Sequence, residues 1–256
     1  MLGSLCRHVR FRVTSPQLGR LCSRKCSSLT GASADMHLHW ASGSAPCWKV
    51  MLVLEEKELR DYPNKRLRFT LEDLKSDEVR KLNPRGQVPI FQDGSTVLKE
   101  SGAVCLYLEH KFQKQGTKLL PDDYSLRGTV LQRMFETENI ALTILKEVAH
   151  VRFLFPKDKV DESRMIPKYK AARRELRLWE DYLSDDSDFL VGNNFTMADV
   201  FLFPYVAFFV RYGLDIGKYP AMEAYYNKVK DRPSVKTTWP PHWANGQGDS
   251  SVLGSI

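Results

Sequence analysis

The feature that most constrains the fold of this chain is a change in the spacing of its apolar residues about midway. Between positions 36 and 112, short apolar segments alternate with amphipathic ones, which predicts the order β-α-β-α-β-β-α. Beyond this region the apolar residues recur at helical spacing, with almost no strand signal. We therefore expect an α/β domain followed by an all-α domain.

The elements of the first domain can be placed from apolar patterns and turn residues. A strand at 37–41 precedes a helix that Pro46 opens, where the missing N–H of proline costs nothing. The remaining predicted elements are a strand at 65–69, a helix at 74–82, a hairpin of 88–92 with 96–99, and a helix at 101–112. In the second domain, helices are predicted at 124–150, 159–183, 196–212 and 218–230.

Composition divides the chain into five segments. Residues 36–113 form the first domain, 114–122 the linker, 123–243 the helical domain and 244–256 a polar tail. Residues 1–35 form an Arg- and Ser-rich leader that is almost free of acidic residues, as in a mitochondrial transit peptide. A disordered basic tail, or untranslated sequence ahead of a start at Met36, are the alternatives.

The strongest local signal in the helical domain lies at Thr196 and Asp199. The Thr196 hydroxyl can accept from the Asp199 N–H while the Asp199 carboxylate accepts from the Thr196 N–H, as in a capping box. Phe195 and Val200 supply the accompanying apolar contact. This motif predicts where a helix begins and says nothing about chemistry.

Charge and cysteine content exclude several classes of function. The leader carries six basic residues against one acidic residue, so five of the seven net positive charges lie there and the body has no compositional case for binding nucleic acid. The longest apolar run, 200–210, has 11 residues, well short of the roughly 20 that cross a membrane. Five cysteines without a CxxC pair predict neither a disulfide framework nor a metal site, and we expect no permanently bound cofactor.

The first domain has the strand order of a thioredoxin-like domain, in which the reactive group lies where the first strand meets the first helix. That position is the segment Ser44–Cys47, and only its last residue is a cysteine. A dithiol oxidoreductase needs two cysteines spaced CxxC, so a two-cysteine cycle is excluded. The Ser44 hydroxyl can instead hydrogen-bond the thiolate of a small thiol.

Four motifs in this order make the chain resemble the cytosolic glutathione transferases from about Met36 to Trp243. They are the segments Ser44–Val50, Asn83–Pro89, Glu100–Ser101 and Phe195–Val200. Among the classes, it looks most like the rho class of fishes and other aquatic animals. The resemblance implies conjugation of reduced glutathione, as co-substrate, to small hydrophobic electrophiles in detoxification. The basic leader departs from the family pattern, which normally begins close to the first strand, and so leaves the localisation open.

The resemblance also implies a set of contacts to glutathione. A cis bond before Pro89 would present the backbone of Val88 to the middle of the tripeptide. The Glu100 carboxylate would hold the α-amino group, and the Ser101 hydroxyl with the helix N-terminus would hold the γ-glutamyl carboxylate. Lys75 and Gln87 would reach the glycine end. From the residues alone, these positions also fit a turn proline, a helix cap and a solvated lysine.

Ser44 is the residue expected to stabilise the thiolate, with Ser42 as second choice. No tyrosine occurs nearby, and Ser44 alone would also fit a plain helix cap. The resemblance places Cys47 inside the first helix, where it would pack as a structural thiol. Because a thiol with a pKa near 8.5 is a few per cent ionised at neutral pH, a hydroxyl donor and the helix N-terminus would supply more of the reactive thiolate.

Residues of the helical domain, including its aromatic C-terminal end, are expected to form the pocket for the electrophile. The candidate lining residues are apolar: Met134, Phe135, Tyr205, Phe208, Phe209, Tyr212, Trp239 and Trp243. Two other functions stay open at this point: a non-catalytic interaction module of the same fold, and a glutathione-dependent peroxidase or isomerase. We further expect a homodimer in the cytoplasm, without membrane or nucleic-acid partners, with mitochondrial import through residues 1–35 as the alternative location.

Overall fold

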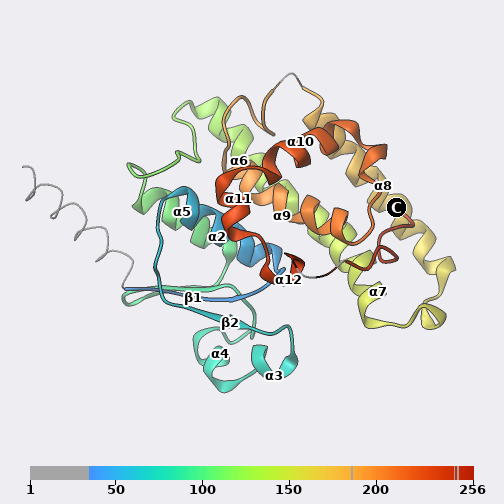
Figure 1. Ribbon diagram of the computed structural model, residues 1–256, viewed down its shortest axis with the longest axis horizontal. Coiled ribbons are helices and arrows are strands. Elements are labelled where there is room, and N and C mark those ends of the chain that lie inside the picture. The colour runs from blue at the N-terminus through green and yellow to red at the C-terminus, as the bar shows by residue number, and fades with distance from the viewer. Residues whose placement is uncertain (1–34, 186, 245, 247) are drawn as a thin grey trace, which may run out of the picture.

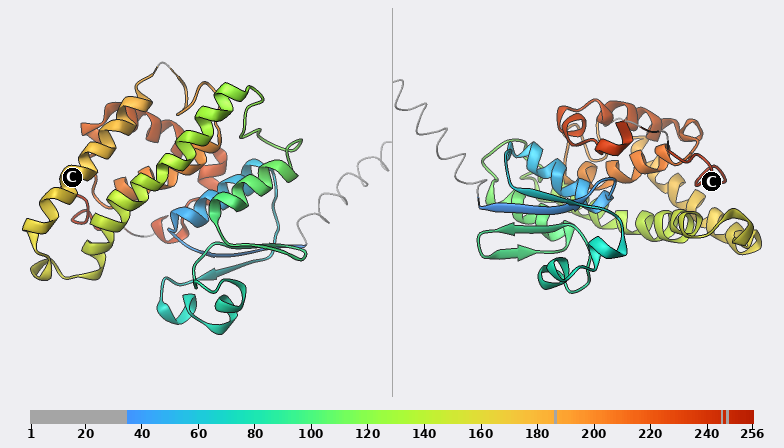
Figure 2. Two further views of the ribbon diagram at one scale, coloured as in Figure 1. Left: turned by 180° about the vertical axis from the view of Figure 1, so that it is seen from behind. Right: turned by 60° about the horizontal axis from the view of Figure 1, so that its bottom comes forward.

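The computed structural model describes residues 35–185, 187–244, 246 and 248–256, and it divides into a sheet-containing part and a helical part (Figures 1 and 2). The expectations for the leader fall almost wholly outside these residues. The predicted fold class is confirmed, since a thioredoxin-like domain precedes an all-helical one.

The sheet of the first domain has four strands in the order β2-β1-β3-β4. Its strands are β1 (Met36–Ala41), β2 (Asn64–Leu67), β3 (Ile90–Asp93) and β4 (Thr96–Leu98). The central strand β1 pairs parallel with β2 and antiparallel with β3. A parallel neighbour requires a crossover connection, and α2 (Ala45–Glu56) supplies it. This crossover places the N-terminus of α2 directly after the end of β1.

The helices of this domain lie on both sides of the sheet (Figure 1). Helices α2 and α5 (Ser101–Lys111) pack together and face the helical domain, while α3 (Leu71–Leu74) and α4 (Asp77–Leu82) lie on the other side. The prediction of one helix at 74–82 is wrong, because two short helices, α3 and α4, occupy residues 71–82. The reason is Ser76, whose hydroxyl accepts from the Val79 N–H and starts a new helix.

The helical domain is built around α9 (Met197–Arg211), which is buried along nearly its whole length. The capping box predicted at its start is present, since the Asp199 carboxylate accepts from the Thr196 N–H at 2.7 Å. The other helices surround α9 (Figure 1). They are α6 (Tyr124–Ile140), α7 (His150–Leu154), α8 (Glu162–Leu183), α10 (Pro220–Lys230), α11 (Pro233–Thr238) and α12 (Pro241–Ala244). Short 3₁₀ turns lie at Lys157–Lys159 and Ile216–Lys218.

The long helix predicted at 124–150 is interrupted by a π-helical segment, η1 (Ala141–Ala149). Such segments insert extra residues into a helical turn and are frequent at functional sites. Ala141 and Leu145 of this segment line the cavity described below. The π-helix was not predicted, because helical apolar spacing does not distinguish it from an α-helix.

The C-terminal segment also differs from the prediction. Two short helices, α11 and α12, occupy a region for which no element was predicted. The segment 244–256, expected to be a polar tail, includes the buried residues Val252, Leu253 and Ile256. The Leu253 N–H donates to the Tyr212 carbonyl at 2.9 Å, which attaches this segment to the end of α9. These apolar residues lie too close to the terminus to show a periodic pattern.

None of the described helices is long and apolar enough to cross a membrane.

Candidate functional site

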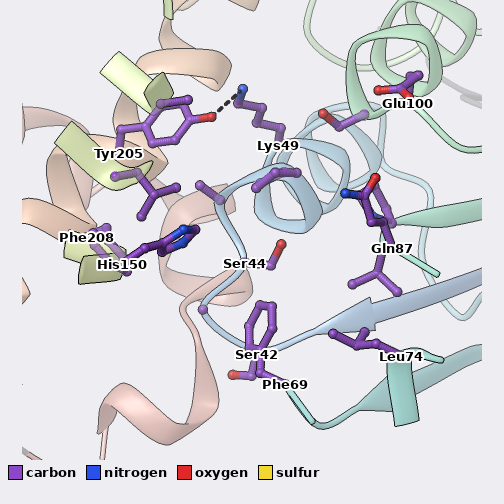
Figure 3. Close-up of a pocket in the computed structure, with 18 of the residues that line it drawn as sticks. Ser42, Ser44, Lys49, Phe69, Leu74, Gln87, Glu100, His150, Tyr205 and Phe208 are labelled. Atoms are coloured by element: carbon purple, nitrogen blue, oxygen red, sulfur yellow. Dashed lines mark hydrogen bonds between the residues drawn. The ribbon is translucent and has the colours of Figure 1, made fainter. Parts of the chain in front are cut away.

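A cavity of about 690 Å³ lies between the two domains, and both contribute to its wall (Figure 3). The first domain contributes the loop and helix at 42–46, the segment 86–89 and the start of α5. The helical domain contributes Tyr205 and Phe208 of α9, part of η1, and His242 of α12. Figure 3 shows Ser44 between Gln87 and Glu100 on one side and the α9 side chains on the other. The cavity therefore has a polar half and an apolar half.

Ser44 lies at the N-terminus of α2, where its extended backbone conformation makes it the N-cap. Its Oγ accepts a hydrogen bond of 3.3 Å from the Cys47 N–H, while the serine itself lines the cavity. Gly43, immediately before it, has a φ of +81°, which glycine adopts without the penalty a side chain would bring. The tight turn thus fixes the hydroxyl at the positive end of the helix dipole.

Ser42 lies on the same loop but has a different partner. Its Oγ is 2.7 Å from Nδ1 of His242, which also lines the cavity. Burial lowers the pKa of His242, and the positive charges of Arg211 and Arg66 lower it further. A neutral imidazole whose Nδ1 carries no hydrogen accepts a hydrogen bond from the Ser42 hydroxyl, and in the other tautomer Nδ1–H donates to it.

Cys47 lies inside the protein and does not line the cavity. It is fully buried in α2, and burial raises the pKa of its thiol to about 11. A thiol with this pKa stays protonated at neutral pH and is a poor nucleophile. Among the described residues, no cluster of His, Cys, Asp and Glu is suited to hold a metal ion.

The polar half of the cavity contains most of the residues expected to contact glutathione. Gln87, Val88, Glu100 and Ser101 line it, and the bond between Val88 and Pro89 is cis. Glu100 is the N-cap of α5, but its carboxylate makes no capping bond. It is therefore free to bind a ligand.

Lys75 lies at the edge of this half and is not among the residues that line the cavity. Its Nζ donates to the carbonyls of Arg85 at 2.6 Å and Gly86 at 3.2 Å. These bonds hold the loop that precedes Gln87.

The apolar half contains only part of the set predicted for it. Phe208 and Tyr212 line the cavity, but Met134 is buried in the core and Phe135 is exposed on α6. Helical spacing could not tell which side of α6 faces the cavity.

Trp239 and Trp243 were also expected in the cavity wall, and the structure places them elsewhere. Both pack edge-to-face against Trp48 of α2, with ring centroids 5.3 and 5.6 Å away. The Trp48 indole N–H also donates to the Thr238 hydroxyl at 2.8 Å. Trp239 and Trp243 therefore pack on the side of α2 that carries Trp48, and the neighbouring His242 lines the cavity instead.

Five polar or charged residues of the wall were not predicted from the sequence: Lys49, Lys99, Glu138, His150 and His242. Lys49 interrupts the apolar run that follows Cys47, which is a signal that could have been noticed. The two histidines lie among mostly apolar residues and belong to none of the motifs described above, so they gave no such signal.

The fold and the cavity define a class of protein in which a thioredoxin-like domain presents a helix N-terminus to a pocket completed by a helical domain. Comparisons with known proteins agree with this class. Residues 38–116 match the family model described as glutathione S-transferase, N-terminal domain, and residues 163–228 match the corresponding C-terminal domain model.

Individual relatives point the same way. Glutathione S-transferase A of Pleuronectes platessa is 44% identical over 223 residues, which cover 87% of this chain and 99% of that protein. The crystal structure of a glutathione S-transferase from the Antarctic clam Laternula elliptica is similar with a TM-score of 0.78 and 43% identity, over 87% of this chain and all of that one. The chain belongs to the glutathione S-transferase family and is a glutathione S-transferase.

Proposed function

We propose that this transferase conjugates the thiolate of reduced glutathione to small hydrophobic electrophiles, with the Ser44 hydroxyl stabilising the thiolate. The observation that carries the proposal is the different hydrogen bonding of two serines on one loop. Ser44 lines the cavity, and its partners are the backbone N–H and the buried thiol of Cys47, so the sulfur of a bound thiol can replace the Cys47 thiol as acceptor of its hydroxyl hydrogen. Ser42 is bound to His242. Ser44 is therefore the better donor to a sulfur atom.

Glutathione would bind along the polar half of the cavity. The Val88 backbone would pair with the peptide groups of the tripeptide, as a strand pairs with a sheet edge. Glu100 would bind the α-amino group, and Ser101 at the start of α5 would bind the γ-glutamyl carboxylate. Gln87, with Lys75 at the edge, would reach the glycine carboxylate. This orientation directs the sulfur toward Ser44.

The thiolate would then attack a carbon of an electrophile held in the apolar half. Phe208 of α9, Tyr212 directly after this helix and Phe153 of α7 form an aromatic cluster there, with ring centroids 4.4 to 6.1 Å apart. Such a surface favours small hydrophobic substrates. One hydroxyl donor and the helix dipole would lower the thiol pKa by about one to two units, at roughly 1.4 kcal/mol each.

The experiment that tests this function has two parts. The full chain should bind to immobilised glutathione and be eluted by free glutathione. It should then conjugate members of a panel of aryl halides, enals and hydroperoxides, with the products identified by mass spectrometry. A protein that failed both assays would fit a non-catalytic interaction module of the same fold.

We also propose that the protein is a homodimer. Large apolar side chains stay exposed on both domains of the monomer: Phe69, Leu71, Leu126, Phe135 and Leu142. Where such side chains form one contiguous patch, they mark a site of protein interaction. Light scattering at micromolar concentration should give about twice the chain mass of 29.5 kDa, and a species of the chain mass alone would contradict the proposal.

The cellular location is a separate proposal. We propose a cytoplasmic protein, with residues 1–35 as the segment that would direct import into mitochondria if import occurs. A fluorescent protein fused to residues 1–35 separates the two, because only a functional transit sequence would carry it into mitochondria.

A further inference from the structure

Two histidines lie next to each other on one face of the central strand β1. His37 and His39 are two residues apart, so both side chains point to the same face of the sheet. This is the face that α3 and α4 cover, away from the helical domain (Figure 1). The centroids of the two imidazole rings are 4.5 Å apart. The function described so far uses neither residue.

The two rings make few polar contacts in the folded protein. His39 is 3% exposed, and His37 is half-buried. Nδ1 of each ring is buried and has no hydrogen-bond partner among the described residues. Because buried polar atoms in proteins nearly always have such a partner, hydrogen bonding does not explain why two histidines lie here.

The charged groups around the pair are unfavourable for protonated rings. Nε2 of His39 lies 3.7 Å from a carboxylate oxygen of Glu78 in α4. The same carboxylate is already bound by Lys65, whose Nζ is 2.5 Å away. Lys65 is also the neighbour of His39 across the pairing of β1 with β2. If both histidines took up a proton, three positive charges would share one carboxylate.

The acids of the two other neighbouring elements, β3 and α3, are engaged elsewhere. Strand β3 places the uncharged Gln92 beside His37. Asp93 of the same strand binds two residues of α5, on the other side of the sheet. Both acids of α3 are bound to Arg68. These carboxylates therefore do not compensate a charge on the histidine pair.

Protonation of the pair is thus unfavourable while α3 and α4 stay packed on the sheet. Burial lowers the pKa of His39, and His37 lowers it further, although Glu78 acts in the opposite direction. A histidine in water has a pKa near 6.5, so below this pH a state in which the rings reach water takes up protons that the packed state excludes. Acid therefore favours a state in which α3 and α4 have moved away from β1.

The segment that covers the histidines is weakly held and supports part of the glutathione site. None of the four residues of α3 is buried, and Val79 is the one buried residue of α4. Val88 packs against the small apolar cluster that includes Val79. Lys75, directly after α3, holds the loop that precedes Gln87. A segment with so few buried contacts opens at low cost, and its opening would displace these residues.

We propose that His37 and His39 form a pH-sensitive switch beneath α3 and α4 that weakens glutathione binding in mildly acidic solution. The proposal rests on the glutathione-binding function proposed above. At neutral pH both rings are uncharged, and the segment stays packed. As the pH falls, proton uptake stabilises the open state, and the apparent affinity for glutathione falls with the fraction of protein that remains closed.

A ligand without a thiol tests the proposal, because it removes the ionisation of the thiol from the measurement. The affinity of the full chain for S-hexylglutathione is measured by calorimetry between pH 7.0 and 5.5 at constant ionic strength. Over this range the ligand keeps its carboxylates ionised and its amino group largely protonated. The variants are His37→Gln, His39→Gln, the double variant and Lys65→Met. His110→Gln is the matched control, since His110 is exposed on α5.

We expect the wild type to lose affinity about tenfold between pH 7.0 and 5.5 and to regain it when the pH is restored. The double variant should keep its affinity within about twofold, and each single variant should fall between the two. Lys65→Met should lose less affinity than the wild type, because Glu78 is then free to bind an imidazolium. His110→Gln should behave like the wild type.

Hydrogen exchange locates the change in the molecule. At pH 5.5, after correction for the intrinsic exchange rate, the amides of residues 71–82 should exchange faster in the wild type than in the double variant. The amides of α9 should not differ. His150 and His242 line the cavity and also carry titratable rings, so the comparison of variants, and not the wild-type curve alone, decides.

An acid-induced loss of the same size in the double variant, or a wild-type affinity that does not change with pH, would overturn the proposal. Loss of affinity without faster exchange in residues 71–82 would overturn it as well. If the double variant does not fold, Lys65→Met and the single variants decide by the same comparison. A wild type that binds S-hexylglutathione at no pH would refute the glutathione-binding function itself.

Discussion

The Ser42 hydroxyl oxygen lies 2.7 Å from Nδ1 of His242, which joins the loop after the first strand to a residue 200 positions later. The neighbouring backbone of this loop, at Gly43, also packs closely against the His242 ring. A side chain at Gly43 would place its Cβ 2.8 Å from the His242 ring, closer than real contacts allow. Helix α12, which carries His242, therefore fixes the conformation of the loop that presents Ser44.

This relationship predicts how substitutions at the two residues combine. His242→Ala should lower kcat/KM for conjugation about two- to tenfold, because the loop that positions Ser44 loses its partner. Ser42→Ala should have a similar effect, and the double variant should be no worse than either single one. Losses that multiply in the double variant would show that the two residues act independently.

Burial of the Lys49 charge predicts a pH-dependent stability difference. Its pKa is about 8 in the folded protein against 10.5 for a free lysine, so between these values the unfolded chain holds a proton that the folded one has released. The contribution of Lys49 to the free energy of unfolding should therefore rise with pH across this window. Cys105 of α5 and Tyr205 of α9 also lie beside Lys49, and burial raises the pKa of each in the folded protein. Glu138 is the neighbouring acid.

Lys49→Met removes the titrating group and provides the measurement. At pH 7 the variant should be more stable than the wild type by up to about 3 kcal/mol in urea unfolding, since no charge is buried. By pH 10 most of this difference should be gone. A difference that does not depend on pH would mean that folding leaves the pKa of Lys49 unchanged.

The buried carboxylate of Asp199 predicts a large structural effect. It accepts from the N–H groups of Leu190 at 3.0 Å and Thr196 at 2.7 Å, and it is fully buried. Asp199→Ala leaves these donors without a partner, at about 1–3 kcal/mol each, so the free energy of unfolding should fall by about 3 kcal/mol or more. Asp199→Asn keeps one acceptor oxygen and should cost clearly less. Equal losses in the two variants would contradict this account.

The fold could be predicted largely because its signals are local or occur in motifs. The apolar spacing located the strands and most helices, and the Thr196 capping box marked the start of α9 within one residue. The short helix α12 gave no such signal, because four residues show no period. Its packing against Trp48 depends on tertiary contacts between distant parts of the chain.

The polar half of the cavity was predictable for a different reason than the apolar half. Glu100, Ser101 and the cis bond before Pro89 belong to short motifs that carry the family resemblance. The apolar half is assembled from single positions on several helices, and which face of α6 turns inward is decided by packing. Of the residues predicted for this half, Phe208 lines the cavity, whereas Met134 is buried in the core.

The central claim is that the Ser44 hydroxyl stabilises the glutathione thiolate, and titration of the bound thiol by its ultraviolet absorbance tests it most directly. In Ser44→Ala the thiolate absorbance should appear at a pH higher by about one to two units, with little change in glutathione affinity. The conjugation rate should fall about ten- to a hundredfold at pH 6.5 and less at pH 9, where more thiol ionises unaided. An unchanged titration in Ser44→Ala, with the shift seen in Ser42→Ala instead, would contradict the claim.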